Sequence, residues 1–232
     1  PKFVYYGGRL SASDLASLPE PTNANWSHLE LYPAYGATHT QSETAFAMRH
    51  ADGNMSTNLV CDNYSVTDVN DLAPNGKSRS GKLLTIRLKD SVYPTYVNLY
   101  YLAYSDVDMI EAWSDIKHGE KKTVTLTQFY SSCMPVRRND VWVDHFHGSW
   151  ASEAQLSRQK LQNGLLEIKN KDGLRNATSD RQEIMLSLNG KPQETCGDVI
   201  GAALMYSGNF RVSIDTDDSE FHYYFAGINP DN

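Results

Sequence analysis

Alternation of apolar and polar residues in short segments is the feature that most restricts how this chain can fold. Residues 82–89 read Lys-Leu-Leu-Thr-Ile-Arg-Leu-Lys and end at Asp90-Ser91. A two-residue period predicts a half-buried strand, because successive side chains of a strand point to opposite faces of the sheet. Strands are also predicted at 96–104, 123–130, 140–147, 165–169, 183–188, 199–206, 210–215 and 221–226. Gly, Asn, Asp or Pro separates these segments, as expected for turns.

Helical patterns are almost absent. Residues 11–18 begin with Ser and Asp signals and predict two helical turns. Residues 151–161 are rich in Ala, Glu, Gln, Arg and Lys, and they favour a helix on propensity alone. Parallel sheets need crossover helices, so the pattern predicts an all-β antiparallel sandwich with few or no helices. Neither a repeat nor a linker interrupts the chain, and we expect a single domain over residues 1–232.

Composition excludes several classes of function. The chain has 232 residues, 40% of them hydrophobic, and a formal net charge of −7. This hydrophobic content permits a sizeable core, whereas the scattered basic residues argue against nucleic-acid binding. No apolar run approaches the ~20 residues that cross a bilayer, so membrane insertion is not expected. The N-terminus lacks a signal-peptide pattern. The compartment is therefore either the cytoplasm, or the periplasm or extracellular space after removal of a signal peptide.

Metal and disulfide patterns are weak. The three cysteines are Cys61, Cys133 and Cys196. Their wide spacing predicts buried thiols, with one disulfide plus a free thiol as the alternative. His145 and His147 share one face of a predicted strand, a spacing that can hold zinc, but no third ligand has its own signature. The acidic residues between 215 and 220 lack the glycine of a calcium loop and predict a hairpin turn. We therefore expect no metal and no cofactor.

The chain also lacks the motifs of a self-contained active site. It has no G-x-S-x-G elbow, P-loop, H-E-x-x-H helix or glycine-rich dinucleotide turn. Asp106, Asp108 and Glu111 are acids beside a strand, and their spacing alone names no catalytic pair. The aromatic residues are more suggestive, with 14 Tyr, 7 Phe and 4 Trp. Exposed Tyr and Trp rings can stack on the C–H faces of sugars, although the same rings can simply fill the core of a sandwich.

Several short sequence motifs, called words below, follow one another along the chain. They are Tyr5-Tyr6-Gly7-Gly8-Arg9-Leu10, Tyr32-Pro33-Ala34-Tyr35-Gly36 with Asp52-Gly53, Asp108-Met109-Ile110-Glu111, the segment 145–153, and Tyr206-Ser207-Gly208-Asn209-Phe210 with Gly227-Ile228-Asn229-Pro230. In this order the words resemble the N-terminal domain of the α-galactosidases of glycoside hydrolase family 36. The resemblance covers nearly the whole chain, and its Tyr-Ser-Gly-Asn-Phe word is specific.

The resemblance implies a β-supersandwich, two large antiparallel sheets packed face to face, within a larger enzyme. Family members begin before the first word and continue after the last into a (β/α)8 barrel and a small C-terminal β domain. Residues 1–232 are thus expected to be truncated at both ends. The nucleophile and the acid/base of the retaining mechanism lie on the barrel, so no catalytic residue is expected here. The resemblance implies that the full-length enzyme removes terminal α-linked galactose from oligosaccharides. Its partners would be its own catalytic barrel, α-galactoside sugars and further copies of itself in a dimer or tetramer.

Three residues are candidates for the wall of the substrate pocket: Tyr35, His39 and Trp150. In several relatives a Tyr-Gly-x-x-Asp-aromatic-Arg word brings its aspartate near the sugar. Here the aligned positions hold His39 and Gln41, so the acid and the arginine are replaced. A stand-alone carbohydrate-binding or protein-interaction sandwich is the alternative function. A reading frame that continues beyond Asn232 with barrel periodicity would favour the enzyme, and a stop codon would favour the module.

Overall fold

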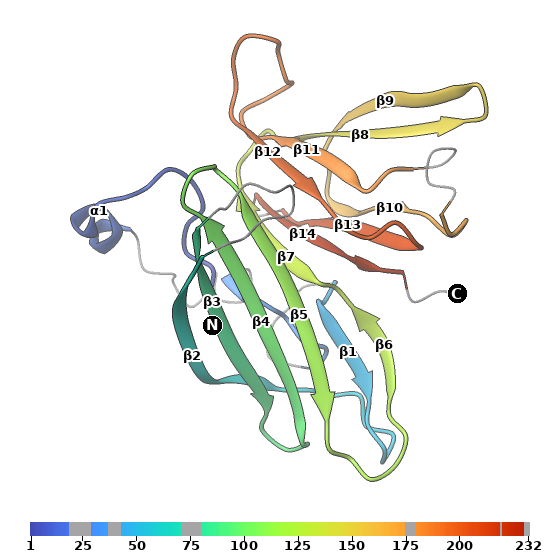
Figure 1. The fold of residues 1–232 in the computed structure, drawn as a ribbon. Helices are drawn as coiled ribbons and strands as arrows, with labels where there is room; N and C mark the ends of the chain where they lie inside the picture. Colours follow the sequence, from blue (N-terminus) through green and yellow to red (C-terminus); the bar gives the residue numbers. More distant parts are fainter. Residues whose placement is uncertain (19–28, 37–42, 71–79, 175–179, 219, 230–232) are drawn as a thin grey trace. The chain divides into compact units, whose positions relative to one another are not determined.

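The structure is a computed structural model that describes residues 1–18, 29–36, 43–70, 80–174, 180–218 and 220–229 (Figure 1). Its described residues form one short helix and fourteen strands, and the paired strands are antiparallel. The all-β prediction is confirmed. The strands are divided among three four-stranded sheets and one two-stranded sheet. The one described helix has six residues, and none in the described part could cross a membrane.

The chain divides into two compact units. Unit 1 comprises the described parts of Pro1–Tyr32, Thr38–Glu43 and Cys133–Asn232, and unit 2 those of Pro33–Ala37 and Thr44–Ser132. The expectation of a single domain stays a prediction.

Unit 2 contains a four-stranded sheet and a strand pair (Figure 1). The sheet has the order β2-β3-β4-β5 and is built from β2 (Leu59–Val69), β3 (Gly81–Asp90), β4 (Thr95–Tyr104) and β5 (Ile110–His118). The pair consists of β1 (Phe46–Arg49) and β6 (Thr125–Phe129). The alternation seen in residues 82–89 works as predicted, because Ile86 and Leu88 are buried whereas Arg87 and Lys89 are exposed. Val97 and Leu99 of β4 lie opposite Leu88 and Ile86 and are buried too.

Unit 1 is a sandwich of two four-stranded sheets around one core. One sheet has the order β10-β13-β14-β7, formed by β10 (Gly164–Lys169), β13 (Phe210–Thr216), β14 (Phe221–Ile228) and β7 (Ser132–Arg137). The other has the order β12-β11-β8-β9, formed by β12 (Val199–Ala203), β11 (Glu183–Ser187), β8 (Trp142–Ser149) and β9 (Ser152–Lys160). Their core includes Val143 and Leu186 from the second sheet, and Phe210 and Val212 from the first. All four side chains are almost fully buried, which stabilises the unit by the usual hydrophobic term.

The predicted helix at residues 11–18 is confirmed as α1 (Ala12–Ser17). A capping box starts it: the Asp14 N–H donates to Ser11 Oγ at 3.1 Å, and the Ser11 N–H donates to Asp14 Oδ2 at 3.3 Å. The hydrogen bonds from Ser11 hold the pKa of Asp14 below its usual value.

The helical prediction for 151–161 is wrong, because Ser152–Lys160 forms β9. This strand pairs with β8, and Arg158 binds the buried carboxylate of Asp144 through two nitrogens at 2.9 and 2.6 Å. Tertiary pairing thus overrides the helix propensity of its residues. Sequence alternation also missed β1, β2, β5 and β7, which were not among the predicted strands.

The cysteines depart in part from the prediction. All three are free thiols, but Cys61 and Cys196 are exposed and only Cys133 is buried. The Cys133 thiol donates to the Leu31 carbonyl, with an Sγ–O distance of 2.7 Å, and burial raises its pKa. Nearby, the Tyr223 hydroxyl donates to the Glu30 carbonyl. The N-terminal segment of unit 1 is therefore tied to β7 and β14.

Candidate functional site

The Tyr35-Gly36 segment of unit 2 is fixed through its backbone. The Tyr35 N–H donates to the Phe46 carbonyl of β1 at 2.8 Å, and the Thr57 N–H donates to the Tyr35 carbonyl at 2.9 Å. The side chain of Tyr35 remains 49% exposed. The backbone is thus held in place while the phenol ring stays available for contacts.

Only glycine fits at position 36. Its φ of +85° lies in the left-handed region, and an added Cβ would meet the Cα of Ser56 at 2.5 Å. Backbone cannot move away as a flexible side chain can. The close approach of this segment to the turn before β2 therefore requires glycine.

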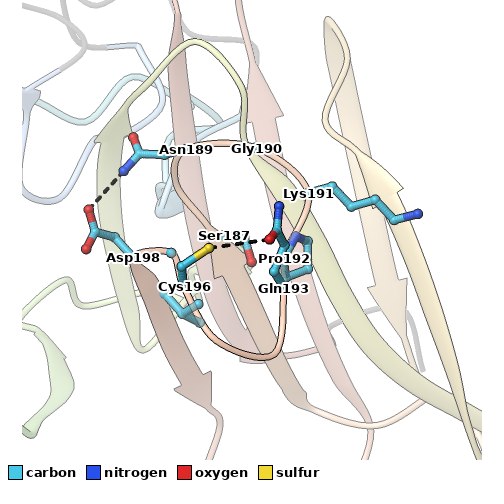
Figure 2. Close-up of a pocket in the computed structure, with 10 residues that line it drawn as sticks. Ser187, Asn189, Gly190, Lys191, Pro192, Gln193, Cys196 and Asp198 are labelled. Atoms are coloured by element: carbon cyan, nitrogen blue, oxygen red, sulfur yellow. Dashed lines mark hydrogen bonds between the residues drawn. The ribbon is translucent and has the colours of Figure 1, made fainter.

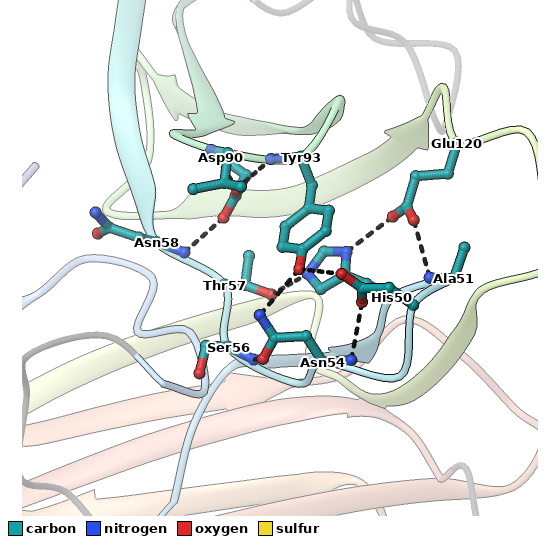
Figure 3. A network of polar contacts seen from close by, with 11 residues as sticks. His50, Ala51, Asn54, Ser56, Thr57, Asn58, Asp90, Tyr93 and Glu120 are labelled. Carbon is teal, nitrogen blue, oxygen red and sulfur yellow. Dashed lines mark hydrogen bonds and ion pairs between the residues drawn. The ribbon is translucent and has the colours of Figure 1, made fainter.

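A network of polar contacts holds that turn (Figure 3). The Asn54 N–H donates to Asp52 Oδ1 at 2.9 Å, and the Ser56 N–H donates to Asn54 Oδ1 at 3.0 Å. Between β3 and β4, the Tyr93 hydroxyl donates to Asp52 Oδ2 at 2.8 Å and accepts from Asn54 Nδ2 at 2.9 Å. The hydrogen bonds from the Asn54 N–H and from Tyr93 lower the pKa of Asp52. Asp52 therefore accepts as a carboxylate at neutral pH.

His50 lies at the centre of the network, stacked on the Tyr93 ring with centroids 3.6 Å apart. Its Nδ1 is 2.8 Å from Glu120 Oε1, and its Nε2 is 3.1 Å from Thr57 Oγ1. An ionised carboxylate can only accept, so the Nδ1–H donates to Glu120. This hydrogen bond is the main reason that the pKa of Glu120 is lowered. Glu120 also accepts from the Ala51 N–H at 2.9 Å.

The order of carboxylate, imidazole and hydroxyl is that of a nucleophilic triad, but Thr57 is fully buried and no substrate can reach it. Its hydroxyl bonds His50, and its N–H bonds the Tyr35 carbonyl. The chain of contacts from Glu120 through His50 and Thr57 thus positions Tyr35-Gly36. We therefore assign it a structural role.

The sequence-predicted residues are placed as follows. His39 lies outside the described residues. Tyr35 is brought close to the Asp52-Gly53 turn, the second half of the same motif, by the contacts above. Trp150, in unit 1, sits on the turn between β8 and β9 and is 87% exposed.

Sequence reasoning missed the four residues that position the motif: His50, Thr57, Tyr93 and Glu120. The one available signal was His50, a histidine directly after four residues that form β1. No spacing rule connects it to Glu120, seventy residues further along the chain.

Unit 1 has a small pocket in the loop between β11 and β12 (Figure 2). Asn189 Nδ2 donates to Asp198 Oδ2 across it at 2.9 Å, and the Cys196 thiol donates to Gln193 Oε1 at 3.4 Å. An amide oxygen does not take a proton from a thiol at neutral pH. The hydrogen-bond partner of the Cys196 thiol in this pocket is thus an amide oxygen, which is not a base.

The two histidines of β8 are His145 and His147, and Asp180 lies beside the first of them. Their ring centroids are 6.3 Å apart, and His145 Nε2 lies 3.5 Å from Asp180 Oδ1. No group of three potential ligands occurs among the described residues. Burial lowers the pKa of His145, so this side chain is neutral at pH 7. The acidic residues before β14 form a hairpin turn as predicted, closed by the Asp217 N–H donating to the Phe221 carbonyl at 3.1 Å.

The family model described as "Glycosyl hydrolase family 36 N-terminal domain" matches residues 1–232. The chain belongs to this family. The resemblance found in the sequence words is thereby confirmed. This family 36 N-terminal domain is 28% identical over 224 residues to the α-galactosidase AgaA of Geobacillus stearothermophilus, covering 91% of this chain and 30% of AgaA. It is 25% identical over 254 residues to the α-galactosidase Mel36A of Lactobacillus acidophilus, covering 99% of this chain and 34% of Mel36A.

Solved structures agree on the fold. A substituted AgaA in complex with raffinose gives a TM-score of 0.83 at 23% identity, covering 99% of this chain and 35% of that chain. The α-galactosidase of Lactobacillus brevis gives 0.80 at 23% identity, covering 98% of this chain and 33% of that one. The domain thus spans about a third of the length of the curated relatives it matches.

Proposed function

We propose that this chain acts as the non-catalytic N-terminal domain of an α-galactosidase that releases terminal α-linked galactose by the retaining mechanism. The match of residues 1–232 to the family 36 N-terminal domain supports the proposal, as does the identity of the curated relatives. The described residues contain a single short helix, so none of them forms a (β/α)8 barrel. We place both catalytic aspartates on a barrel outside residues 1–232.

The observation that carries the role of the domain is the Tyr35-Gly36 segment. Its backbone is held by Phe46 and Thr57, yet the Tyr35 side chain is half exposed. A fixed backbone with an available side chain suits a residue that lines a pocket. We propose that Tyr35, with His39, contributes to the wall of the galactoside pocket, and that Trp150 makes a second contact.

We further propose that the domain supports the barrel and makes contacts in a homodimer or homotetramer. Large apolar residues are exposed on β8, β9 and β11: Phe146, Leu156 and Met185 are each at least 40% exposed in this chain. Their exposure supports the proposal that another domain or subunit covers this surface. Size-exclusion chromatography with light scattering on the full-length enzyme tests the assembly. A monomer would contradict the oligomer proposal.

The 232-residue chain alone is expected not to hydrolyse p-nitrophenyl α-galactoside, because we place both catalytic aspartates on the barrel. Release of p-nitrophenol is measured at 400 nm in the purified chain, with the full-length enzyme as positive control. Turnover by the pure chain that survives removal of trace contaminants would refute the assignment of catalysis to another domain.

In the full-length enzyme, Trp150→Ala and His39→Ala are each expected to lower kcat/KM for raffinose roughly 5- to 10-fold. Such a loss corresponds to one stacking contact or one hydrogen bond. Leu174→Ala serves as the matched control, because Leu174 is also strongly exposed in unit 1. Steady-state kinetics that match those of the control in both variants would leave these residues a structural role only.

A further inference from the structure

The two faces of the β2–β5 sheet differ in chemistry. One face carries Ile86, Leu88, Val97 and Leu99, all buried in unit 2. On the other face, the residues that alternate with them are polar or aromatic and at least partly exposed: Thr85, Arg87, Lys89, Tyr96, Asn98 and Tyr100. Further along the same face, Leu102 is buried. The central part of this face lies on β3, β4 and β5.

An aromatic pair forms one row of this face. Tyr100 of β4 lies directly opposite Trp113 of β5. Their rings are nearly parallel, with an interplanar angle of 11° and centroids 5.1 Å apart. Trp113 is 40% exposed, so part of this stacked pair faces solvent. Such a surface offers π faces and edges to an apolar ligand surface at little entropic cost, because stacking already fixes the rings.

The neighbouring row consists of hydrogen-bonding groups. Arg87, Asn98 and Asp115 lie side by side across β3, β4 and β5. Asp115 Oδ1 accepts from Asn98 Nδ2 at 2.8 Å, and Asp115 Oδ2 accepts from the Tyr100 hydroxyl at 2.7 Å. Each carboxylate oxygen can accept about two hydrogen bonds, so a held carboxylate retains acceptor sites. The hydrogen bond to Asp115 also raises the pKa of Tyr100, which keeps the phenol protonated at neutral pH.

Arg87 completes the row. Its guanidinium lies over the Tyr96 ring, 4.6 Å from the centroid, and its Nε is 3.5 Å from Asp62 Oδ2. These contacts orient the guanidinium, and the side chain is still 44% exposed. A planar guanidinium has five N–H donors, so several remain available for a ligand. Arg87 and Asp115 carry opposite charges, which gives the patch no preference for an ionic ligand.

We propose that the face formed by Arg87, Asn98, Tyr100, Trp113 and Asp115 binds a neutral oligosaccharide. Sugar rings pair apolar C–H faces with hydroxyls that both donate and accept. The aromatic row suits the C–H faces, and the row of donors and acceptors suits the hydroxyls. From strand spacings of ~4.8 Å and ~6.8 Å between alternate residues, the patch measures roughly 10 by 7 Å, enough for one or two sugar rings.

A sugar suits this face better than a protein partner. The cores of protein interfaces are depleted of aspartate, and here the Asp115 carboxylate accepts a hydrogen bond from Tyr100 of the aromatic pair. The existence of the site does not depend on the α-galactosidase proposal, because the chain alone carries every residue of the patch.

The test maps raffinose binding on the isotopically labelled 232-residue chain by two-dimensional ¹H–¹⁵N NMR. Saturable shifts are expected for the Trp113 indole N–H and for the amides around Asn98 and Asp115, with a Kd of roughly 1 mM. Trp113→Ala is expected to weaken binding roughly 3- to 10-fold, by loss of one stacking contact. Tyr64→Ala is the matched control, because this ring is 73% exposed on the opposite face of the same sheet.

Mapping on the unsubstituted chain keeps the proposal testable even if Trp113→Ala fails to fold. The proposal would be overturned if the Trp113 signals did not shift with raffinose at up to about 50 mM, which is 50-fold above the expected Kd. Shifts confined to Trp150, or a variant that binds as the unsubstituted chain does, would also overturn it. Shifts of the same signals with protein concentration and no sugar would assign the face to a second copy and equally refute the sugar site.

Discussion

Gly36→Ala is expected to destabilise unit 2 by about 2–5 kcal/mol. The left-handed φ costs a residue with a Cβ about 1–2 kcal/mol, and forcing an extra atom into a packed region costs about 1–3 kcal/mol more. The added Cβ would meet the backbone of Ser56 at 2.5 Å, and both hydrogen bonds of Tyr35 resist a shift of the segment. Urea unfolding followed by circular dichroism measures the loss.

Gly53→Ala is a closely matched control for this substitution. Gly53 has a φ of +90°, close to the +85° of Gly36, but nothing lies within 4 Å of its added Cβ. The control should therefore lose only the conformational part, about 1–2 kcal/mol. Equal losses in the two variants would show that the close approach to Ser56 does not restrict Gly36.

His50→Ala is expected to destabilise unit 2 by about 2–4 kcal/mol at pH 7. The substitution removes a buried ring stacked on Tyr93 and leaves Glu120 and Thr57 without their shared partner. Loss of a buried side chain and of the partner of a carboxylate each contribute to this figure. Urea unfolding at pH 7 gives the free energy of unfolding of both proteins.

The same pair predicts a pH dependence. The folded-state pKa of Glu120 is lowered, chiefly by the hydrogen bond from His50, so its contribution to stability is present above the unfolded pKa of about 4.3. That contribution is lost as the pH falls through the lowered folded-state pKa. As the pH falls below about 4.3, the unsubstituted chain should therefore lose stability more steeply than Glu120→Gln, which keeps the shape of the side chain without its titration. Parallel curves for the two proteins would contradict a stabilising role of the Glu120 carboxylate.

The sequence predicted most of the strands because burial on one face leaves a period of two, as in β3. The same pattern is missing from β2 and β9, and the sequence therefore did not predict these strands. In β9 every residue is exposed or only partly buried, so its pattern carries helix propensity instead of alternation. Its conformation comes from pairing with β8 and from the Arg158–Asp144 contact, which are long-range features.

Only the part of the candidate site that lies in a family sequence motif was predictable. Tyr35 and the Asp52-Gly53 turn stood out in sequence, and the structure joins them through Thr57 and the turn at Asn54. His50 and Glu120 could not be paired, because their contact depends on how β1 and the segment after β5 meet in space. The sugar-binding face was out of reach for the same reason, since strand register alone places Trp113 beside Tyr100.

The tie between the N-terminal segment and β14 has a consequence for the order of events during synthesis. The Tyr223 hydroxyl and the Glu30 carbonyl are separated by 193 residues. At a synthesis rate of about 5–20 residues per second, the N-terminal segment waits roughly 10–40 s for its last partner to emerge. The hairpins of unit 2 pair locally within one continuous stretch and emerge in between. We therefore expect unit 2 to fold first, while the two ends of unit 1 close only after β14 has been synthesised.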